Sequence, residues 1–251
     1  MDDDLVDIAA EIRSAESVVA LTGAGVSTAS GIPDFRSEDG IWSEYDPMDF
    51  HLTRFRADPG GFWRDRVGMI EDLFAGDPEP NAAHESLAAL ESAGQLDTLV
   101  TQNVDGLHRA AGSNTPIDIH GNGRRVVCTD CGVKGGVERA MECVRGGETP
   151  PTCERCGGVF KPDVVLFGEE LSKEKLARSR SAAEGADVFL AIGTSLSVEP
   201  VASLPRHALD AGGTVCVVNL DRTGVSADAE YDIRADVTDV LPQVTDQVLV
   251  R

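Results

Sequence analysis

Short apolar runs rich in β-branched residues recur along this chain, and amphipathic stretches of helical length separate them. Strands that alternate with helices pair in parallel, because each helix carries the chain back to the start of the next strand. We therefore expect an α/β fold built on a parallel sheet. The runs predict strands at Val18–Thr22, Leu96–Thr101, Ile117–Ile119, Val164–Phe167, Val188–Ile192 and Val215–Asn219. The periodic stretches predict helices at Asp3–Ser14, Gly61–Phe74, Asn81–Ser92, Ser172–Glu184, Val201–Ala211 and Val237–Val248.

Two segments interrupt this alternation. Residues 39–80 carry helix signals but no strand, and residues 121–162 hold five of the six cysteines and many glycines. The second shift in composition is typical of a module inserted into a larger domain.

The charge balance is strongly acidic. The chain has 22 Lys and Arg residues against 43 Asp and Glu residues, a net charge of −21, and only four of the bases are Lys. Such a charge repels a phosphate backbone, which disfavours general nucleic-acid binding. Because the acidic residues are scattered rather than grouped in blocks, we favour adaptation to high internal salt over an acidic patch for a basic partner.

The sequence contains no apolar run near the roughly 20 residues that a membrane span needs. Its first residues, Met1 to Asp4, are acidic where a signal peptide would be basic. We expect a soluble cytoplasmic protein that acts without a membrane.

Five of the predicted strands end in glycine turns or in small polar and ionisable residues. In an open parallel sheet, ligands bind outside the carboxyl ends of the strands. Five such ends therefore predict one site, formed by residues 22–25, 101–105, 120–121, 193–195 and 219–221.

The motif GAGVSTASGIPDFR, residues 23–36, follows the first strand. Gly23 and Gly25 let the backbone approach a pyrophosphate, and we expect a helix N-terminus behind them to supply N–H donors. Thr28 stands where a dinucleotide motif has its third glycine, so the pattern alone is weak. Arg36 adds a guanidinium for phosphate. A second turn, residues 193–195, would serve the other end of the same dinucleotide.

Two Cys-x2-Cys pairs are separated by 21 residues, a spacing typical of a four-thiolate zinc site. Four protein ligands leave no open position, so the metal should be structural. Disulfides are a poorer explanation in a cytosolic protein. The predicted ligands are Cys128, Cys131, Cys153 and Cys156; Cys143 is the nearest competitor, and Cys216 is expected to be a small buried side chain.

His120 is the candidate general base, because it stands at a strand end and imidazole titrates near neutral pH. The other four histidines lie in or beside helical patterns, where a packed or solvated side chain is the default interpretation. Asn103 and Asp105 follow the neighbouring strand, and an amide with a carboxylate suits recognition of a carboxamide. An Asx-turn after the strand is the alternative.

Taken together, the motifs resemble those of the sirtuin family, the NAD-dependent protein lysine deacylases. The similarity runs in family order from about Val18 to Pro242 through GAGVSTASGIPDFR, TQNVDGLH, IHG, the Cys pairs, VVLFGE, GTSLSVEP and VVNLD. It implies a Rossmann-like NAD-binding domain, residues 1–40, 81–120 and 163–251, and a small domain in which a helical insert, 41–80, joins a zinc ribbon, 121–162. NAD and acyl-lysine would meet between the two domains.

The resemblance also implies roles for individual residues. His120 would be the general base, Asn103 would orient the nicotinamide ribose and a water molecule, and Phe35 would shield the ribose after nicotinamide leaves. The other implied NAD contacts are Gly23, Ala24, Gly25, Ile32, Asp34, Arg36, Gln102, Val104, Asp105, Gly193, Thr194, Ser195, Asn219, Asp221 and the backbone near Val237, where the family usually has Ala. The residues that would bind the substrate backbone as an added strand are Val165, Phe167, Gly168, Glu169, Ser197 and Val198.

The implied reaction consumes NAD as a co-substrate and yields nicotinamide, free lysine and O-acyl-ADP-ribose. Three alternatives stay open. An NAD-dependent oxidoreductase would share the sheet and the glycine turns, but it would normally carry an acidic residue after the second strand of the βαβ unit, and that strand is not evident in this sequence. A non-enzymatic zinc-ribbon module would explain the cysteines but not the strand ends. Mono-ADP-ribosyl transfer would use the same NAD pocket.

The acyl group itself is ambiguous. Trp63 and Arg66 lie three apart on a predicted helix, and sirtuins that remove succinyl and malonyl groups carry a Tyr and an Arg at this spacing. Arg66 fits that pattern, but the indole of Trp63 offers one N–H from a different position. We favour a solvated Arg66 and therefore acetyl-lysine as the main substrate.

Overall fold

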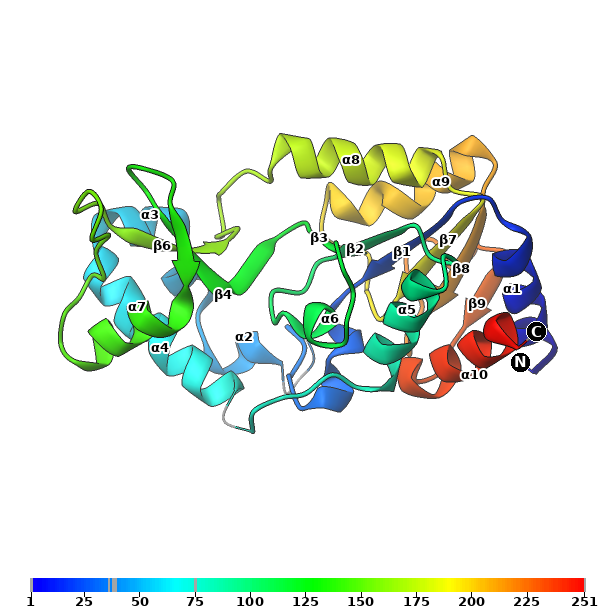
Figure 1. The fold of residues 1–251 in the computed structure, drawn as a ribbon, viewed down its shortest axis with the longest axis horizontal. Coiled ribbons are helices and arrows are strands. Elements are labelled where there is room, and N and C mark those ends of the chain that lie inside the picture. The colour runs from blue at the N-terminus through cyan, green and yellow to red at the C-terminus, as the bar shows by residue number, and fades with distance from the viewer. Residues whose placement is uncertain (1, 36, 38–39, 75, 251) are drawn as a thin grey trace.

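The computed structural model describes residues 2–35, 37, 40–74 and 76–250. Within these residues the chain forms two sheets at opposite ends of an elongated molecule (Figure 1). The larger sheet has the order β3-β2-β1-β7-β8-β9 with every pair parallel, which is the doubly wound order of a Rossmann-like fold. Its strands are β1 (Val18–Thr22), β2 (Thr98–Thr101), β3 (Ile117–Asp118), β7 (Val188–Ile192), β8 (Thr214–Val218) and β9 (Tyr231–Ile233). The predicted α/β fold is confirmed.

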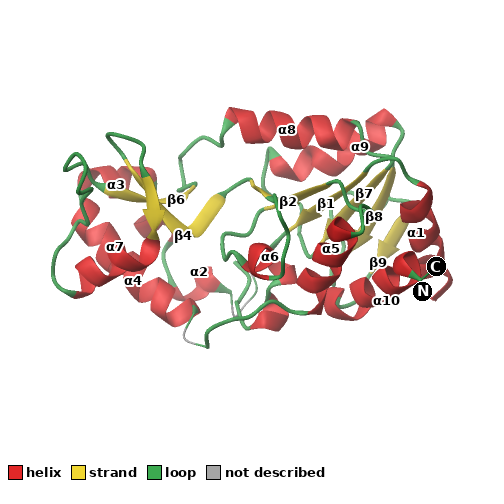
Figure 2. Ribbon diagram, viewed as in Figure 1, coloured by secondary structure: helices red, strands yellow, loops and turns green. Residues whose placement is uncertain are grey.

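Helices cover both faces of this sheet (Figures 1 and 2). Val18 and Ala20 of β1 pack into the core under α1 (Asp2–Ser14), α5 (Ala82–Ser92) and α10 (Val237–Leu249). Val19 and Leu21 pack into the core under α8 (Lys173–Glu184) and α9 (Leu204–Ala211). Because both faces are buried, the strand sequences are apolar without alternation.

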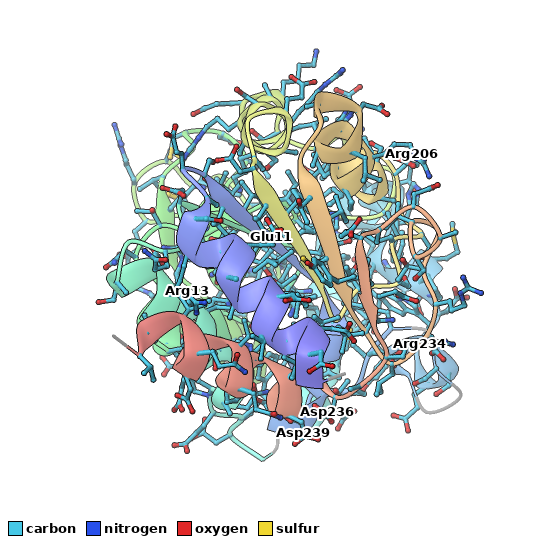
Figure 3. All side chains as sticks on the ribbon, turned by 90° about the vertical axis from the view of Figure 1, so that its right-hand side faces the viewer. Glu11, Arg13, Arg206, Arg234, Asp236 and Asp239 are labelled. Carbon is cyan, nitrogen blue, oxygen red and sulfur yellow. The ribbon has the colours of Figure 1, made fainter. Side chains whose placement is uncertain are left out.

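The helices α1 and α10 pack side by side at one end of the molecule (Figure 3). Arg13 of α1 donates a hydrogen bond to the carbonyl of Gln247 in α10, at 2.7 Å. Charged side chains surround these helices, as expected for a chain of this net charge. Among the described residues, every helix is too short or too polar to cross a membrane.

The smaller sheet is antiparallel, with the order β5-β4-β6. Its strands are β4 (Gly121–Cys128), β5 (Lys134–Gly136) and β6 (Phe160–Val164). It shares a core with segments from residues 41–80, in which Phe62, Trp63 and Met141 are buried. The helices at this end are α2 (Ile41–Glu44), α3 (Leu52–Ala57), α4 (Pro59–Leu73) and α7 (Val137–Arg145).

The structure differs from the predicted elements in several places, among them the unpredicted helix α7 in the zinc-ribbon segment. The strand expected at 164–167 is instead β6, which begins at Phe160 and pairs with β4 in the small sheet. The helix expected directly after Gly25 is a pair of 3₁₀ turns, Ala24–Val26 and Thr28–Ser30, and Gly31 ends the second with φ +86°. Strands β4, β5 and β9 were not predicted, because they are short or rich in glycine and charge.

Candidate active site

The two glycine turns meet at the carboxyl ends of β1 and β7, where the strand order reverses direction. The Gly25 N–H donates to the Gly193 carbonyl at 2.9 Å. A Cβ atom on Gly25 would lie 2.9 Å from that oxygen, and Gly193 has φ +56°. These glycines are therefore required by the packing of one turn on the other, whatever they bind. The short 3₁₀ turns that follow lack the dipole of a full helix. The expectation of a helix N-terminus behind Gly23 and Gly25 is therefore wrong.

Ser27 lies at the centre of the polar cluster behind these turns. Its hydroxyl donates to Asp105 Oδ2 at 2.8 Å and accepts from Asn103 Nδ2 at 3.1 Å. Asn103 Nδ2 also lies 3.0 Å from the Gly23 carbonyl. Sequence reasoning did not single out Ser27, because a serine in a glycine-rich segment looks like any other turn residue.

Asp105 is buried, and this burial raises the pKa of its carboxyl. The backbone N–H of Leu107 and the hydroxyl of Ser27 donate to the carboxyl and oppose the rise. The Leu107 bond begins α6 (Leu107–Ala110), so part of Asp105 does form the Asx-turn considered from the sequence. Its second oxygen is oriented toward Ser27.

Two buried histidines pack behind Ser27. The rings of His84 and His108 lie 4.8 Å apart, and His84 Nε2 lies 3.4 Å from Ser27 Oγ. Burial lowers the pKa of His84 to about 4 and that of His108 to about 3, so both are neutral near pH 7. Of the two interpretations that the sequence left open, packed or solvated, the structure has both histidines packed.

His120 follows β3 and is oriented by the neighbouring strand end. Its Nδ1 lies 3.1 Å from the Gln102 carbonyl, a bond in which the imidazole must donate. The other nitrogen, Nε2, is then unprotonated and can accept a proton. Burial lowers the pKa of His120. Gln102 in turn donates from Nε2 to Thr194 Oγ1 at 2.9 Å, which links the second glycine turn to this residue.

The predicted substrate segment begins beside His120. The Val165 N–H donates to the His120 carbonyl at 2.8 Å. Phe167 is 44% exposed and packs edge-on against Trp42, and Glu169 accepts from Lys161 at 3.0 Å. Gly168, at φ +75°, packs so closely on His51 that a Cβ atom would clash with the imidazole. The second predicted segment is exposed at Ser197, whose hydroxyl lies 2.9 Å from that of Ser195.

The other residues that were predicted to contact NAD differ in their burial and in their partners. Ile32 is buried, and Phe35 stacks on Trp42 with the ring centroids 5.6 Å apart. Asn219 donates to the Asp221 carbonyl in an exposed turn at the end of β8. Val237 is the first residue of α10, and its side chain is buried in the core. Arg36 lies outside the described residues.

Arg66 and Trp63 are buried in α4, and the expectation of a solvated Arg66 is wrong. The Trp63 indole donates to the Phe160 carbonyl at 2.7 Å, which uses its single N–H. Arg66 Nε has no hydrogen-bond partner within the part of the chain that the structure describes. Burial lowers the pKa of Arg66 to about 10, so the guanidinium stays charged at neutral pH.

The four predicted zinc ligands come together at the end of the small sheet. The sulfur atoms of Cys128, Cys131, Cys153 and Cys156 all lie within 4.8 Å of one another, and Cys143 and Cys216 are not part of this group. The backbone N–H groups of Cys131 and Asp130 lower the pKa of Cys128 to about 7. Hydrogen bonds with the neighbouring thiols help to raise the pKa of Cys156 to about 12, so the shifts within the group have opposite directions. Four thiols clustered in this way fit a tetrahedral zinc ion.

Comparison with known proteins identifies the family. The Sir2 family model matches residues 23–200, from the first glycine turn to the segment after the second. The chain belongs to the Sir2 family. An NAD-dependent protein deacetylase of Haloarcula marismortui is 51% identical over 251 residues, 99% of this chain and 96% of that protein.

Solved Sir2 structures share the whole fold. A Sir2 homologue in complex with NAD is 38% identical with a TM-score of 0.84, over 99% of this chain and 94% of that chain. A Sir2 variant with a deacetylated p53 peptide and 3′-O-acetyl-ADP-ribose is 32% identical with a TM-score of 0.87, over 98% of this chain and 97% of that chain. The resemblance to the sirtuins inferred from the motifs is confirmed.

Proposed function

We propose that this Sir2 protein is an NAD-dependent protein lysine deacetylase. The observation that carries the proposal is His120, whose Nδ1 donates to the Gln102 carbonyl and whose Nε2 is therefore a base beside the other strand ends. The Haloarcula relative is named a deacetylase, and one related structure holds both a deacetylated peptide and O-acetyl-ADP-ribose. NAD supplies the ADP-ribose that accepts the acetyl group, with loss of nicotinamide.

The residues around Ser27 would hold the nicotinamide end of NAD. Asp105 and Asn103 are buried and fixed by Ser27, so their orientation does not depend on the ligand. The Asp105 carboxyl can accept an amide N–H. Val104 precedes it in the chain, and the family resemblance adds Ile32 to the same contact. The joined glycine turns present Ala24, Thr194 and Ser195 at the same edge of the sheet for the phosphates and riboses.

His120 would remove a proton from the ribose during acyl transfer. It can do so at neutral pH, because burial lowers its pKa and keeps the imidazole neutral. Asn103 lies at the neighbouring strand end and would orient the ribose and the attacking water. These residues account for proton transfer and positioning.

The substrate peptide would bind in extended form between residues 165–169 and 197–198. The first of these segments is tied to His120 by the Val165 N–H, and the aromatic ring of Phe167 is exposed beside it. Main-chain pairing accepts many sequences, so acyl-lysine in different proteins can be a substrate.

We also propose a structural zinc ion on the four clustered thiols and two domains with the predicted boundaries. The separate core of the smaller sheet, which joins residues 41–80 to the ribbon, supports the second point. Strand β6 runs through the proposed boundary at residue 163, so the two domains share this strand. The cluster of unpaired thiols supports a reducing compartment such as the cytoplasm.

The direct test is to incubate the protein with NAD and an acetyl-lysine peptide and to identify all products by mass. We expect free lysine, nicotinamide and O-acetyl-ADP-ribose in equal amounts. His120→Ala is the matched negative control. A peptide that gains ADP-ribose while it keeps its acetyl group would instead establish mono-ADP-ribosyl transfer. Recovery of unchanged NAD and peptide would contradict the proposal.

Removal of acidic acyl groups is a second candidate activity, and buried Arg66 favours it. Its Nε is buried without a hydrogen-bond partner among the described residues, which is costly for a charged group, and a carboxylate would compensate it. Its Nη2 lies 3.6 Å from the position of a Cβ on Gly123, whose N–H donates to the Val104 carbonyl at 2.7 Å. Arg66 therefore borders the Asn103–Asp105 segment. Trp63 cannot assist, because its N–H is used by Phe160.

Comparing kcat/KM for acetyl and succinyl peptides separates the two activities. We expect acetyl to be preferred, with a measurable succinyl activity that falls at least about tenfold in Arg66→Ala. Arg64 is an exposed arginine two residues away on the same helix, so Arg64→Ala is the control. It should change neither the acetyl nor the succinyl activity. Equal loss on both peptides in Arg66→Ala would show that Arg66 only supports the fold.

A further inference from the structure

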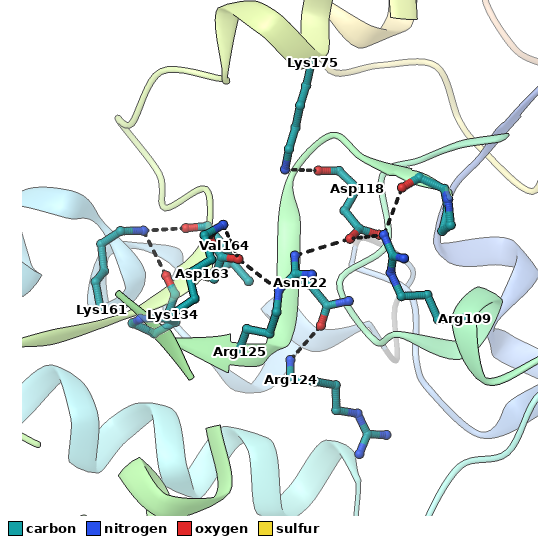
Figure 4. Close-up of polar contacts among 12 residues, drawn as sticks. Arg109, Asp118, Asn122, Arg124, Arg125, Lys134, Lys161, Asp163, Val164 and Lys175 are labelled. Carbon is teal, nitrogen blue, oxygen red and sulfur yellow. Dashed lines mark hydrogen bonds and ion pairs between the residues drawn. The ribbon is translucent and has the colours of Figure 1, made fainter. Parts of the chain in front are cut away.

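A group of charged residues joins the two sheets at the point where β3 leads into β4. The buried carboxylate of Asp118 accepts from Arg109 at 3.0 Å and from Arg125 at 3.4 Å (Figure 4). Arg125 also binds Asp163 of β6 through Nε at 3.0 Å, and Lys134 binds the same carboxylate at 2.9 Å. This group therefore fixes the chain on both sides of His120, which lies two residues after Asp118.

Lys175 reaches this group from the first turn of α8. Its Nζ donates to the backbone carbonyl of Asp118 at 2.6 Å, as Figure 4 shows. Three of the four lysines of the chain, Lys134, Lys161 and Lys175, take part in ion pairs or hydrogen bonds at this joint. Lysine, whose ammonium is a compact point charge, is therefore concentrated at this joint, whereas arginine carries most of the positive charge elsewhere in the chain.

We propose that Lys175 is a positioning residue for His120: its ammonium holds the Asp118 carbonyl, two residues before His120, and so fixes the strand end that carries the imidazole. The inference rests on the proposed function, because it concerns the base of that reaction. The hydrogen bond of the Lys175 ammonium goes to this carbonyl, so Lys175 acts through His120.

The charges around Lys175 and His120 agree with this role. Burial lowers the pKa of Lys175, Asp118 of β3 and Asp163 of β6 oppose this fall, and Lys134 and Arg125 add to it. Burial lowers the pKa of His120 and the Lys175 charge lowers it further, while the Gln102 carbonyl raises it. A cation that faces an imidazole disfavours the imidazolium, because the two like charges repel. Removing the Lys175 charge must therefore raise the pKa of His120.

The first experiment follows the histidine ring signals by NMR as a function of pH and needs no reaction. The His120 signal is assigned by its loss in His120→Asn. In Lys175→Met it should titrate at higher pH than in the wild type, and Lys175→Arg should restore the wild-type value. Lys173→Met, an exposed lysine on the same helix, is the matched control and should leave the titration unchanged.

The second experiment measures the pH profile of deacetylation. In Lys175→Met we expect kcat/KM to fall about tenfold at pH 8 and further at pH 6, with the acid limb displaced to higher pH and KM for NAD little changed. An unchanged His120 titration in Lys175→Met, or an equal change in Lys173→Met, would overturn the inference. Absence of deacetylation in the wild type would refute the proposed function and leave the NMR result to decide the role of Lys175.

Discussion

The imidazole of His120 donates from Nδ1 to the Gln102 carbonyl across 3.1 Å, and this single bond selects which nitrogen acts as the base. The two residues come from adjacent strand ends, β3 and β2, whose parallel pairing fixes their separation. The same strand end carries Asn103. The chemistry of the site therefore depends on the register of the sheet.

Replacing His120 by alanine should abolish deacylation and leave NAD binding largely intact. Loss of a general base costs about 10²–10⁴-fold in rate, and the His120 side chain bonds to the Gln102 carbonyl rather than to the glycine turns. Because the pKa of His120 is lowered, the acid limb of wild-type kcat/KM should lie below pH 6.5, the usual value for histidine. Turnover near the wild-type rate in His120→Ala would show that His120 is not the general base.

The next prediction concerns which thiols bind the zinc ion. We expect one zinc ion per chain, lost from Cys131→Ser and retained in Cys143→Ser, because Cys143 lies outside the group of four sulfur atoms. Elemental analysis of the purified variants measures this. Metal loss from Cys143→Ser would show that the ligand set is wrong.

Salt should stabilise the fold. A net charge of −21 causes self-repulsion at low ionic strength, and added ions screen it. We expect the melting temperature to rise by several degrees from low salt to molar potassium chloride, and to rise less at pH 4, where many carboxylates are protonated. A flat or falling curve at neutral pH would favour the acidic-patch interpretation.

Acid should destabilise the protein through the buried histidines. His84 and His108 have pKa values of about 4 and about 3 in the fold and about 6.5 when unfolded. The unfolded state therefore binds more protons below pH 6.5, and stability is lost as the pH falls from there toward 3.

In His108→Gln the decline in melting temperature between pH 7 and pH 4.5 should be smaller than in the wild type by roughly 5 °C. His207→Gln, a histidine on α9 that is only partly buried, is the control and should keep the wild-type slope. Equal slopes in all three proteins would mean that His108 is not buried in its neutral form.

The sequence predicted those features that depend on local pattern. Strands β1 and β7 have the predicted bounds, because both faces of each strand are buried and the apolar runs end where the glycine turns begin. The clustering of strand ends followed from parallel pairing alone. The boundaries of β6 were missed because its partner β4 is antiparallel and lies in the insert.

Side-chain surroundings depend on residues far along the chain and were predicted less well. Arg66 was expected in solvent, although it shares a helix face with Phe62 and Trp63, four and three residues earlier, and both are buried. That spacing is a usable signal for burial. Ser27 and Lys175 carry no such signal, because their partners are 78 and 57 residues away along the chain.

The placement of the lysines has a practical consequence for handling this protein. Lys134, Lys161 and Lys175 lie at the joint between the sheets, and Lys173 begins the helix that carries Lys175. Reagents that attach dyes, cross-linkers or resins to lysine amines would therefore act mainly at this joint and on the helix beside it. Attachment through carboxyl groups would instead be spread over the many acidic side chains along the chain.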